Sequence, residues 1–329
     1  MEKVVAVVVS YNRQGLLSEC IQALRAQTRK PDEILVVNNG STDNTEQWLS
    51  TQPDIKFITQ ANLGSGGGFS TGIQWAFKNN FTWIWCMDDD GYPAPEALQR
   101  LLDHDSSDRS LMNCAVVSKD DRESFVWKTG GYTNIHSVNE PVIKNAGHPF
   151  NGTLIHRAIV ERVGVPNPAY FLWGDETEYY YRIVRQNKIP VFTVTSAIHY
   201  HPPAAFNYKD DWNFSSSWKM YYYVRNRYHI HLVKFNNKLI ALVNYLCFIA
   251  AFAGIILVFQ RTDRLKKLRS IVRPVADAFT NNFTATPSLI LQKLNNSKNV
   301  QSRPGVLNTA WWNIFQGSPK HAHNTSAAA

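Results

Sequence analysis

Short apolar runs alternate with amphipathic segments over the first hundred residues. The apolar runs, rich in β-branched side chains, lie at residues 4–9, 33–37, 55–59 and 82–87. Segments with helical spacing follow them at residues 16–27, 45–49, 69–78 and 93–102. Continuous apolar strands that alternate with helices are typical of a parallel sheet with helices on both faces. We therefore predict an α/β fold with a mostly parallel sheet.

The pattern is mixed from residue 114 to residue 201, and its character changes at residue 239. Predicted strands lie at residues 116–117, 125–127 and 191–198, and predicted helices at residues 158–163 and 175–186. We expect residues 1–110 and 111–232 to form the two halves of one α/β domain. We expect residues 233–329 to form a helical region that ends in a disordered tail.

Leu239–Phe259 is an uncharged stretch of about 20 residues, long enough to cross a bilayer. Basic residues flank it on both sides, so the charges give no orientation for a single span. We favour a monotopic or re-entrant helix at the surface of an anionic membrane over a true span. The alternative is a helix buried in the protein core.

The composition fits a folded protein with an anionic ligand. Apolar residues make up 44% of the 329 residues and aromatic residues 12%, which excludes wholesale disorder. The net charge of +8 suits nucleic acid, anionic lipid or phosphate groups. The apolar start of the chain predicts a strand and not a signal peptide. The four cysteines lack metal-binding spacing and are expected as free thiols, so we expect a cytoplasmic protein.

Polar motifs follow each of the first four predicted strands. They are Ser10-Tyr11-Asn12, Asn38 to Asp43, Asn62 to Gly68, and Asp88 to Asp90. Ligands of open α/β sheets bind beyond the carboxyl ends of the strands. We therefore expect these four motifs to form one site.

Asp88, Asp89 and Asp90 are three adjacent carboxylates that repel one another. A divalent cation would relieve this repulsion, and oxygen ligands suit Mg²⁺ or Mn²⁺. Such a metal could bridge a diphosphate and neutralise a leaving nucleoside diphosphate. The alternative is a solvated acidic turn.

Asn62 to Phe69 form a glycine-rich loop that opens a helix. Glycine lets backbone N–H groups approach a ligand, and a helix N-terminus favours anions. The lysine of a Walker motif and the strict dinucleotide fingerprint are both missing from this run. A flexible turn is the alternative.

Residues 171–179 combine aromatic and acidic side chains at the start of a predicted helix. A carboxylate here could deprotonate an acceptor hydroxyl, and Trp173 could stack on a sugar. The alternative is an acidic first turn that favours the helix dipole.

His199 and His201 end the predicted strand at residues 191–198. We interpret their alternation as placing them on opposite faces, so that one of them faces the site. Imidazole is a plausible third metal ligand beside the aspartates.

Together these motifs resemble glycosyltransferase family two, which has the GT-A fold. The matching runs are SYNR from Ser10, ALRAQTRKPDEILVVNNGSTDNT from Ala23, NLGSGGGFSTG from Asn62, WIWCMDDDGYPAPEAL from Trp83 and WGDETEYYYR from Trp173. The resemblance spans roughly residues 1 to 205. It is greatest to bacterial galactofuranosyltransferases and rhamnosyltransferases, which build cell-wall or O-antigen polysaccharide.

The resemblance implies an inverting, metal-dependent transfer from a nucleotide sugar. Asp88 and Asp90 match the ligands of Mn²⁺ or Mg²⁺, with His201 as the third ligand and His199 as the fallback. Glu176 matches the catalytic base, which is usually aspartate, and Asp175 could replace it. Trp173 and Glu178 are expected to bind the acceptor. The expected donor-binding residues are Ser10, Tyr11, Asn12, Arg13, Asn39, Asn62, Gly64, Gly66, Gly67, Asp88 and Asp89.

Two departures from the family pattern leave open the nucleotide of the donor and the identity of the base. Asn38-Asn39 replaces the more usual pair with an aspartate that binds uracil in many relatives, so uridine and thymidine both stay in question. Glu176 stands where relatives have aspartate. The expected acceptor is a glycan on a polyprenyl diphosphate at the inner face of the cell membrane.

Three other classes of protein fit the sequence less well. A nucleotidyltransferase would need a basic residue near the first strand, and Arg13 is the nearby candidate. A non-catalytic membrane scaffold would predict damaged acidic motifs, whereas these are intact. Nucleic acid is not an expected partner, because the basic residues cluster beside an apolar run instead of interleaving with aromatic residues.

Overall fold

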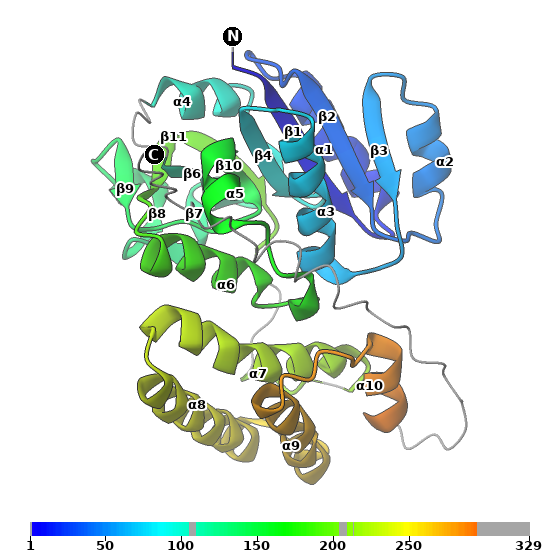
Figure 1. The fold of residues 1–329 in the computed structure, drawn as a ribbon, viewed down its shortest axis with the longest axis vertical. Helices are drawn as coiled ribbons and strands as arrows, with labels where there is room; N and C mark the ends of the chain where they lie inside the picture. Colours follow the sequence, from blue (N-terminus) through cyan, green and yellow to red (C-terminus); the bar gives the residue numbers. More distant parts are fainter. Residues whose placement is uncertain (1, 105–109, 204–208, 213, 295–329) are drawn as a thin grey trace, which may run out of the picture.

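A mixed β-sheet forms the centre of the α/β part of the chain (Figure 1). The structure is a computed structural model and describes residues 2–104, 110–203, 209–212 and 214–294. The main strand order is β3-β2-β1-β4-β10-β6-β11-β5. The first four strands in this order are parallel to one another, and β10 is antiparallel to both of its neighbours. The predicted α/β class and mostly parallel first half are confirmed.

The elements of the α/β part follow the sequence pattern closely. Its strands are β1 (Val4–Ser10), β2 (Glu33–Asn38), β3 (Ile55–Thr59), β4 (Trp83–Asp88), β5 (Tyr92–Pro93), β6 (Leu111–Ser118), β7 (Ser124–Thr129), β8 (Tyr132–Asn134), β9 (Val142–Lys144), β10 (Asn151–His156) and β11 (Val191–His201). Its longer helices are α1 (Gln14–Arg25), α2 (Thr45–Ser50), α3 (Gly64–Lys78), α4 (Ala97–Asp103), α5 (Arg157–Val163) and α6 (Asp175–Tyr181). A π-helical turn, η3 (Arg182–Gln186), continues α6.

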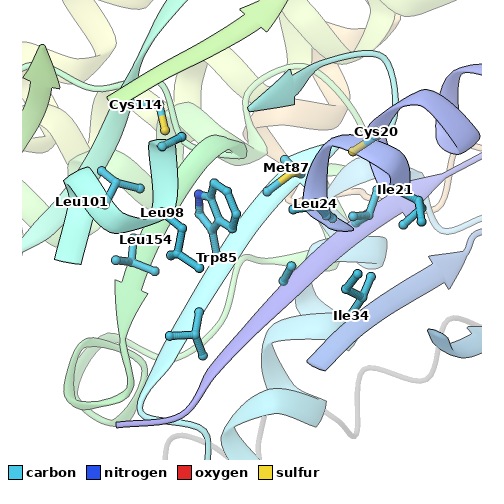
Figure 2. Close-up of a cluster of buried hydrophobic side chains, with 14 of the residues drawn as sticks. Cys20, Ile21, Leu24, Ile34, Trp85, Met87, Leu98, Leu101, Cys114 and Leu154 are labelled. Atoms are coloured by element: carbon cyan, nitrogen blue, oxygen red, sulfur yellow. The ribbon is translucent and has the colours of Figure 1, made fainter. Parts of the chain in front are cut away.

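Strand β1 is buried on both faces, as its unbroken apolar sequence predicts. Val4, Ala6 and Val8 face one core, which α1 and α4 cover. Figure 2 shows part of this core, with Ile21 and Leu24 of α1 near Ile34 and with Leu98 and Leu101 of α4 near Trp85. The alternate side chains of β1 face a second core under α3, α5 and α6. Burial on both faces fixes the strand ends that carry the polar motifs.

Helix α3 begins at Gly64, five residues earlier than predicted, so the glycine-rich loop is the first turn of a helix. A Cβ atom on Gly68 would lie 2.5 Å from Val9 Cγ1, and one on Gly72 would lie 2.3 Å from Val7 Cγ1. These two glycines therefore let α3 approach β1 closely. Poor intrinsic helix propensity made this segment look like a loop, and tertiary packing overrides it.

The predicted helix at residues 93–102 is wrong at its start. Tyr92–Pro93 forms the short strand β5, which pairs antiparallel with β11 so that Pro93 lies opposite His199. Helix α4 begins only at Ala97. The pairing draws the chain that follows the aspartates across the end of β11.

Four helices form a separate layer below the α/β part (Figure 1). They are α7 (Phe214–Phe235), α8 (Lys238–Phe259), α9 (Arg264–Phe279) and α10 (Pro287–Leu294). Helix α7 contacts α6 and also packs against α8, α9 and α10. The division of the chain at residue 232 stays a prediction, and the predicted disordered tail lies outside the described residues.

Helix α8 is not a buried core helix. It is the one helix in the described part of the chain that is long and apolar enough to cross a membrane, and only 17% of its most apolar window is buried. Ala241, Tyr245, Phe252 and Ile256 face the other helices. Its outer face is apolar and exposed at Leu239, Ile240, Val243, Leu246, Leu257, Val258 and Phe259.

Candidate active site

Hydrogen bonds that involve side chains join the polar motifs at the strand ends into one continuous surface. Ser10 Oγ, at the end of β1, donates to Asp89 Oδ2 at 2.7 Å. The backbone N–H of Thr42 donates to Asn12 Oδ1 at 2.6 Å and links the β1 end to the β2 end. The polar motifs after β1, β2 and β4 therefore meet at one edge of the sheet, and the use of this edge as a binding site stays a prediction.

Asn39 ties the end of β2 to the start of α3. Its Nδ2 donates to the Gly64 carbonyl oxygen at 2.9 Å, and its Oδ1 accepts from Gln60 Nε2 at 2.9 Å and from the Leu63 N–H at 3.2 Å. The side chain is buried and its hydrogen-bonding groups are engaged within the protein. Its role in holding a nucleobase stays a prediction, as do donor contacts by Asn62 and by the buried Gly64, Gly66 and Gly67. Tyr11, by contrast, is 44% exposed beside this edge.

Arg13 binds two of the three aspartates. Its Nη1 lies 2.6 Å from Asp90 Oδ2 and 3.2 Å from Asp89 Oδ1. Burial raises the pKa of Asp88 well above its usual range, and the charges of Asp90 and Asp89 add to this rise. One guanidinium beside three carboxylates leaves the cluster short of positive charge.

His201 faces the aspartates from the end of β11. Its Nε2 lies 3.3 Å from Asp90 Oδ1, and its Nδ1 lies 2.7 Å from the Pro202 carbonyl oxygen. Burial raises the pKa of Asp90, but His201 and Arg13 outweigh burial and lower this pKa to about 2. The Nδ1–H of His201 donates to the Pro202 carbonyl oxygen and holds the ring, so that Nε2 is the nitrogen that a divalent metal beside Asp90 would bind.

The interpretation that His199 and His201 lie on opposite faces is wrong. Residues two apart in a strand share a face, because side chains alternate with a period of two. His199 lies under the aspartate loop, where a Cβ atom on Gly91 would be 2.3 Å from its Nε2. It is fully buried, neither ring nitrogen has a hydrogen-bond partner among the described residues, and burial lowers its pKa to about 3.

The residues at this edge fit a divalent metal only in part. Two carboxylates and an imidazole, with a shortage of positive charge, are a donor set for Mn²⁺ or Mg²⁺. No three such side chains converge into a complete site in the described ranges. Oxygen atoms of a bound diphosphate would have to complete the coordination.

Helix α6 presents two carboxylates in different surroundings. Asp175 is fully buried, accepts from Ser65 Oγ at 2.8 Å, and has its pKa raised well above its usual range by burial and by Glu176. Glu176 is only partly buried, and its charge reaches both Asp88 and His148. Glu176 is therefore the more accessible of the two carboxylates, and Asp175 ties α6 to α3.

Glu178 and Trp173 have partners within the protein. Glu178 is buried, and both of its carboxylate oxygens accept from Arg182, at 2.9 and 3.0 Å. Trp173 packs against the helical layer, where Lys219 Nζ lies 5.6 Å from its ring centroid. Acceptor binding by these two residues stays a prediction.

Sequence reasoning missed several residues near the site. The Trp127 ring, on β7, lies 5.0 Å from the His201 ring and 5.3 Å from the His148 ring. Burial lowers the pKa of His148 to about 4, so its imidazole is neutral. Lys219 of α7 is close enough to Arg13 for the two charges to interact. No local pattern marks these residues, because distant segments bring them together.

Arg225 and Asn226 of α7 hold the loop that precedes α6. Asn226 Nδ2 donates to the carbonyl oxygens of Tyr170, Leu172 and Trp173 at 3.0 to 3.1 Å, and Arg225 Nη2 donates to those of Ala169 and Tyr170. Both side chains are fully buried. The loop has positive φ angles of 65° at Phe171 and 54° at Trp173. The hydrogen bonds from Arg225 and Asn226 therefore stabilise a strained backbone.

The sheet order and the acidic strand ends define a glycosyltransferase of the GT-A fold. Residues 5–163 match the sequence model of glycosyl transferase family 2. Over 223 residues, the chain is 32% identical to galactofuranosyltransferase GlfT1 of Mycolicibacterium smegmatis, covering 63% of this chain and 74% of the relative. The chain belongs to glycosyl transferase family 2.

Other relatives agree with this family. The chain is 28% identical to galactofuranosyltransferase GlfT1 of Mycobacterium tuberculosis H37Rv, over 63% of this chain and 73% of that one. It is 25% identical to the low-salt glycan biosynthesis hexosyltransferase Agl10 of Haloferax volcanii, over 68% and 73%. The crystal structure of S. aureus TarS is similar in fold, with a TM-score of 0.50 and 14% identity over 86% of this chain and 54% of that chain.

Proposed function

We propose that this glycosyltransferase transfers galactofuranose from its uridine diphosphate donor to a hydroxyl of a growing cell-surface glycan. The observation that carries the proposal is the cluster at this edge of the sheet, where Arg13 and His201 both lie against Asp90 and where Ser65 ties α6, the helix of Glu176, to α3. The aspartate cluster would bind the donor diphosphate, and Glu176 would act as the base beside it. The choice of galactofuranose rests on relatives named as galactofuranosyltransferases, and rhamnose from thymidine diphosphate is the second candidate.

The donor would lie along the ends of the parallel strands. Tyr11 is exposed at the end of β1 and offers a ring for the nucleobase. Arg13 can move its guanidinium from Asp90 toward a diphosphate, since its side chain is 48% exposed. Asp88 and Asp90, with His201, would hold Mn²⁺ or Mg²⁺, which would neutralise charge on the leaving nucleoside diphosphate.

Glu176 would accept the proton of the acceptor hydroxyl as that oxygen attacks the anomeric carbon. The C–O bond to the diphosphate breaks in the same displacement, so the anomeric configuration inverts. Trp127, whose ring lies 5.0 Å from the His201 ring, and Trp173, which precedes α6, are candidate platforms for the acceptor sugar. Asp175 has the weaker claim as base, because it is buried and bonded to Ser65.

The outer face of α8 supports an acceptor at a membrane. Apolar side chains from Leu239 to Phe259 are exposed on it, and α7 and α9 cover the opposite face. A helix with one face packed on protein and one apolar face exposed fits insertion into one leaflet better than a span. We propose monotopic attachment to the anionic inner face of the cell membrane, where polyprenyl-diphosphate-linked glycans would be the acceptors.

A donor-binding screen tests this proposal. Calorimetry with Mn²⁺ or Mg²⁺ would compare UDP-galactofuranose, UDP-galactose, UDP-glucose, dTDP-rhamnose and GDP-mannose. We expect metal-dependent binding of UDP-galactofuranose that is lost in Asp88→Asn/Asp90→Asn. Equal, metal-independent behaviour toward all donors would remove the aspartates from the site and favour a non-catalytic scaffold.

A further inference from the structure

A basic hollow lies between the α/β part and the helical layer. It has a volume of about 480 Å³ and is lined by Arg185, Gln186, Lys188, Lys234, Phe235 and Asn236. Three of these six side chains are cationic and none is acidic. They come from two segments far apart in sequence, the end of η3 and the end of α7. The hollow therefore gathers positive charge without a partner of its own in the lining.

The backbone on both sides of the hollow turns sharply. Lys188 and Asn236 have positive φ angles of 57° and 50°. These residues of left-handed conformation follow η3 and α7, and they turn the chain at the edge of the hollow. Lys234 Nζ also lies over two rings, 5.3 Å from the Tyr181 centroid and 5.2 Å from that of Phe235. Its ammonium group is thus held near the hollow instead of extending freely into solvent.

The hollow lies where the exposed apolar face of α8 begins. Asn236 is two residues before Lys238, the first residue of α8. Leu239, Ile240 and Val243 follow, with exposed fractions of 69%, 46% and 51%. A ligand with a phosphate group and an apolar tail matches this order of charge and apolar surface.

We propose that this hollow binds the phosphate headgroup of an anionic phospholipid, with the acyl chains along the outer face of α8. The inference rests on the membrane attachment proposed above and names the site that recognises the lipid. Arg185 and Glu176 belong to one continuous helical segment, nine residues apart, or about 14 Å at 1.5 Å per residue. A lipid bound here would therefore fix the height of the base above the bilayer.

The test is flotation of the full-length protein with vesicles of phosphatidylglycerol and, separately, of phosphatidylcholine. The pocket variant is Arg185→Gln/Lys188→Gln/Lys234→Gln. The matched control is Lys30→Gln/Lys78→Gln/Arg162→Gln, which removes the same charge from exposed residues of the α/β part. We expect the wild type and the control to bind phosphatidylglycerol vesicles alike, and the pocket variant to bind at least about tenfold more weakly.

Several results would overturn the inference. Equal losses in both triple variants would mean that net charge alone attracts the protein. Full displacement from vesicles by glycerol phosphate would assign the hollow to a soluble phosphate. Normal vesicle binding with lost transfer to a lipid-linked acceptor would assign it to the acceptor diphosphate. Donor binding is measured on the same variants and should be unchanged, so failure of this inference is distinguishable from failure of the proposed function.

Discussion

The side-chain amide of Asn226 donates a hydrogen bond to the carbonyl oxygen of Trp173, 3.1 Å away. Asn226 lies on α7 of the helical layer, and Trp173 precedes the first turn of α6, which carries Glu176. The same amide nitrogen also binds the carbonyl oxygens of Tyr170 and Leu172. The helical layer therefore holds the segment that precedes Glu176.

Replacing Asn226 with aspartate should damage this arrangement. The change would set a carboxylate against three carbonyl oxygens in a buried position, and loss of buried hydrogen bonds costs about 1–3 kcal/mol. We expect a lower melting temperature and a lower kcat, with a smaller change in the KM of the donor. Asn139→Asp, at an exposed position of the α/β part, is the control and should leave both unchanged. A pair of variants with equal kcat would contradict a positioning role for Asn226.

Glu176→Gln should abolish most transfer while the protein stays folded. A positioned general base contributes about 10²–10⁴-fold, and glutamine cannot accept the proton. Donor binding, measured by calorimetry, should persist. Asp175→Asn serves as the comparison and should retain most of its activity, because Asp175 is buried behind Ser65. If Asp175→Asn were the inactive variant, the assignment of the base would have to be exchanged.

The buried carboxyl of Asp175 predicts a pH dependence of stability. Its folded-state pKa is raised because burial disfavours the charged form. The stability that its neutral form contributes is fully present below about pH 4, the unfolded pKa, and is lost as pH rises toward the folded pKa. The Asp175→Asn variant has no such carboxyl group and does not lose this stability. The unfolding free energy of the variant minus that of the wild type should therefore increase as the pH rises above 4, by at most about 1.4 kcal/mol per pH unit. Parallel denaturation curves from pH 4 to pH 8 would refute this.

Gly72→Ala should separate α3 from β1. Its added Cβ atom would lie 2.3 Å from Val7 Cγ1 in a closely packed core, and overpacking of this kind costs about 1–3 kcal/mol. Chemical denaturation would measure the loss. Gly15→Ala in α1 is the matched control, since nothing lies within 4 Å of its added atom, and its higher helix propensity should leave stability equal or slightly greater.

The strands of the first half and their common polar edge could be predicted from the sequence. Their unbroken apolar runs are stable only when both faces of the strand are buried. The positions of Ser10, Asn39 and Asp88 at the strand ends can therefore be predicted from the local pattern alone. The start of α3 could not be predicted in this way. Contacts of Gly68 and Gly72 with β1 stabilise a helix that their own propensity opposes.

The remainder of the site depends on partners far apart in sequence. The hydrogen bond from Asn226 to Trp173 joins residues more than fifty positions apart, and the contact of the Trp127 ring with the His201 ring joins residues still farther apart. Neither contact leaves a periodic pattern. A buried Arg225-Asn226 pair within an aromatic helix was the available signal, because a buried arginine needs acceptors. The prediction that His199 and His201 lie on opposite faces was wrong, because side chains alternate along a strand and residues two apart share one face.

The most direct test of the account is transfer itself. The protein would be incubated with Mn²⁺, UDP-galactofuranose and a polyprenyl-diphosphate-linked glycan, and the product would be analysed by mass spectrometry and by NMR at the new anomeric carbon. The account predicts an acceptor extended by galactofuranose, with inverted configuration, and no extension by Glu176→Gln. A product with retained configuration, or an acceptor left unextended with every nucleotide sugar tried, would contradict it.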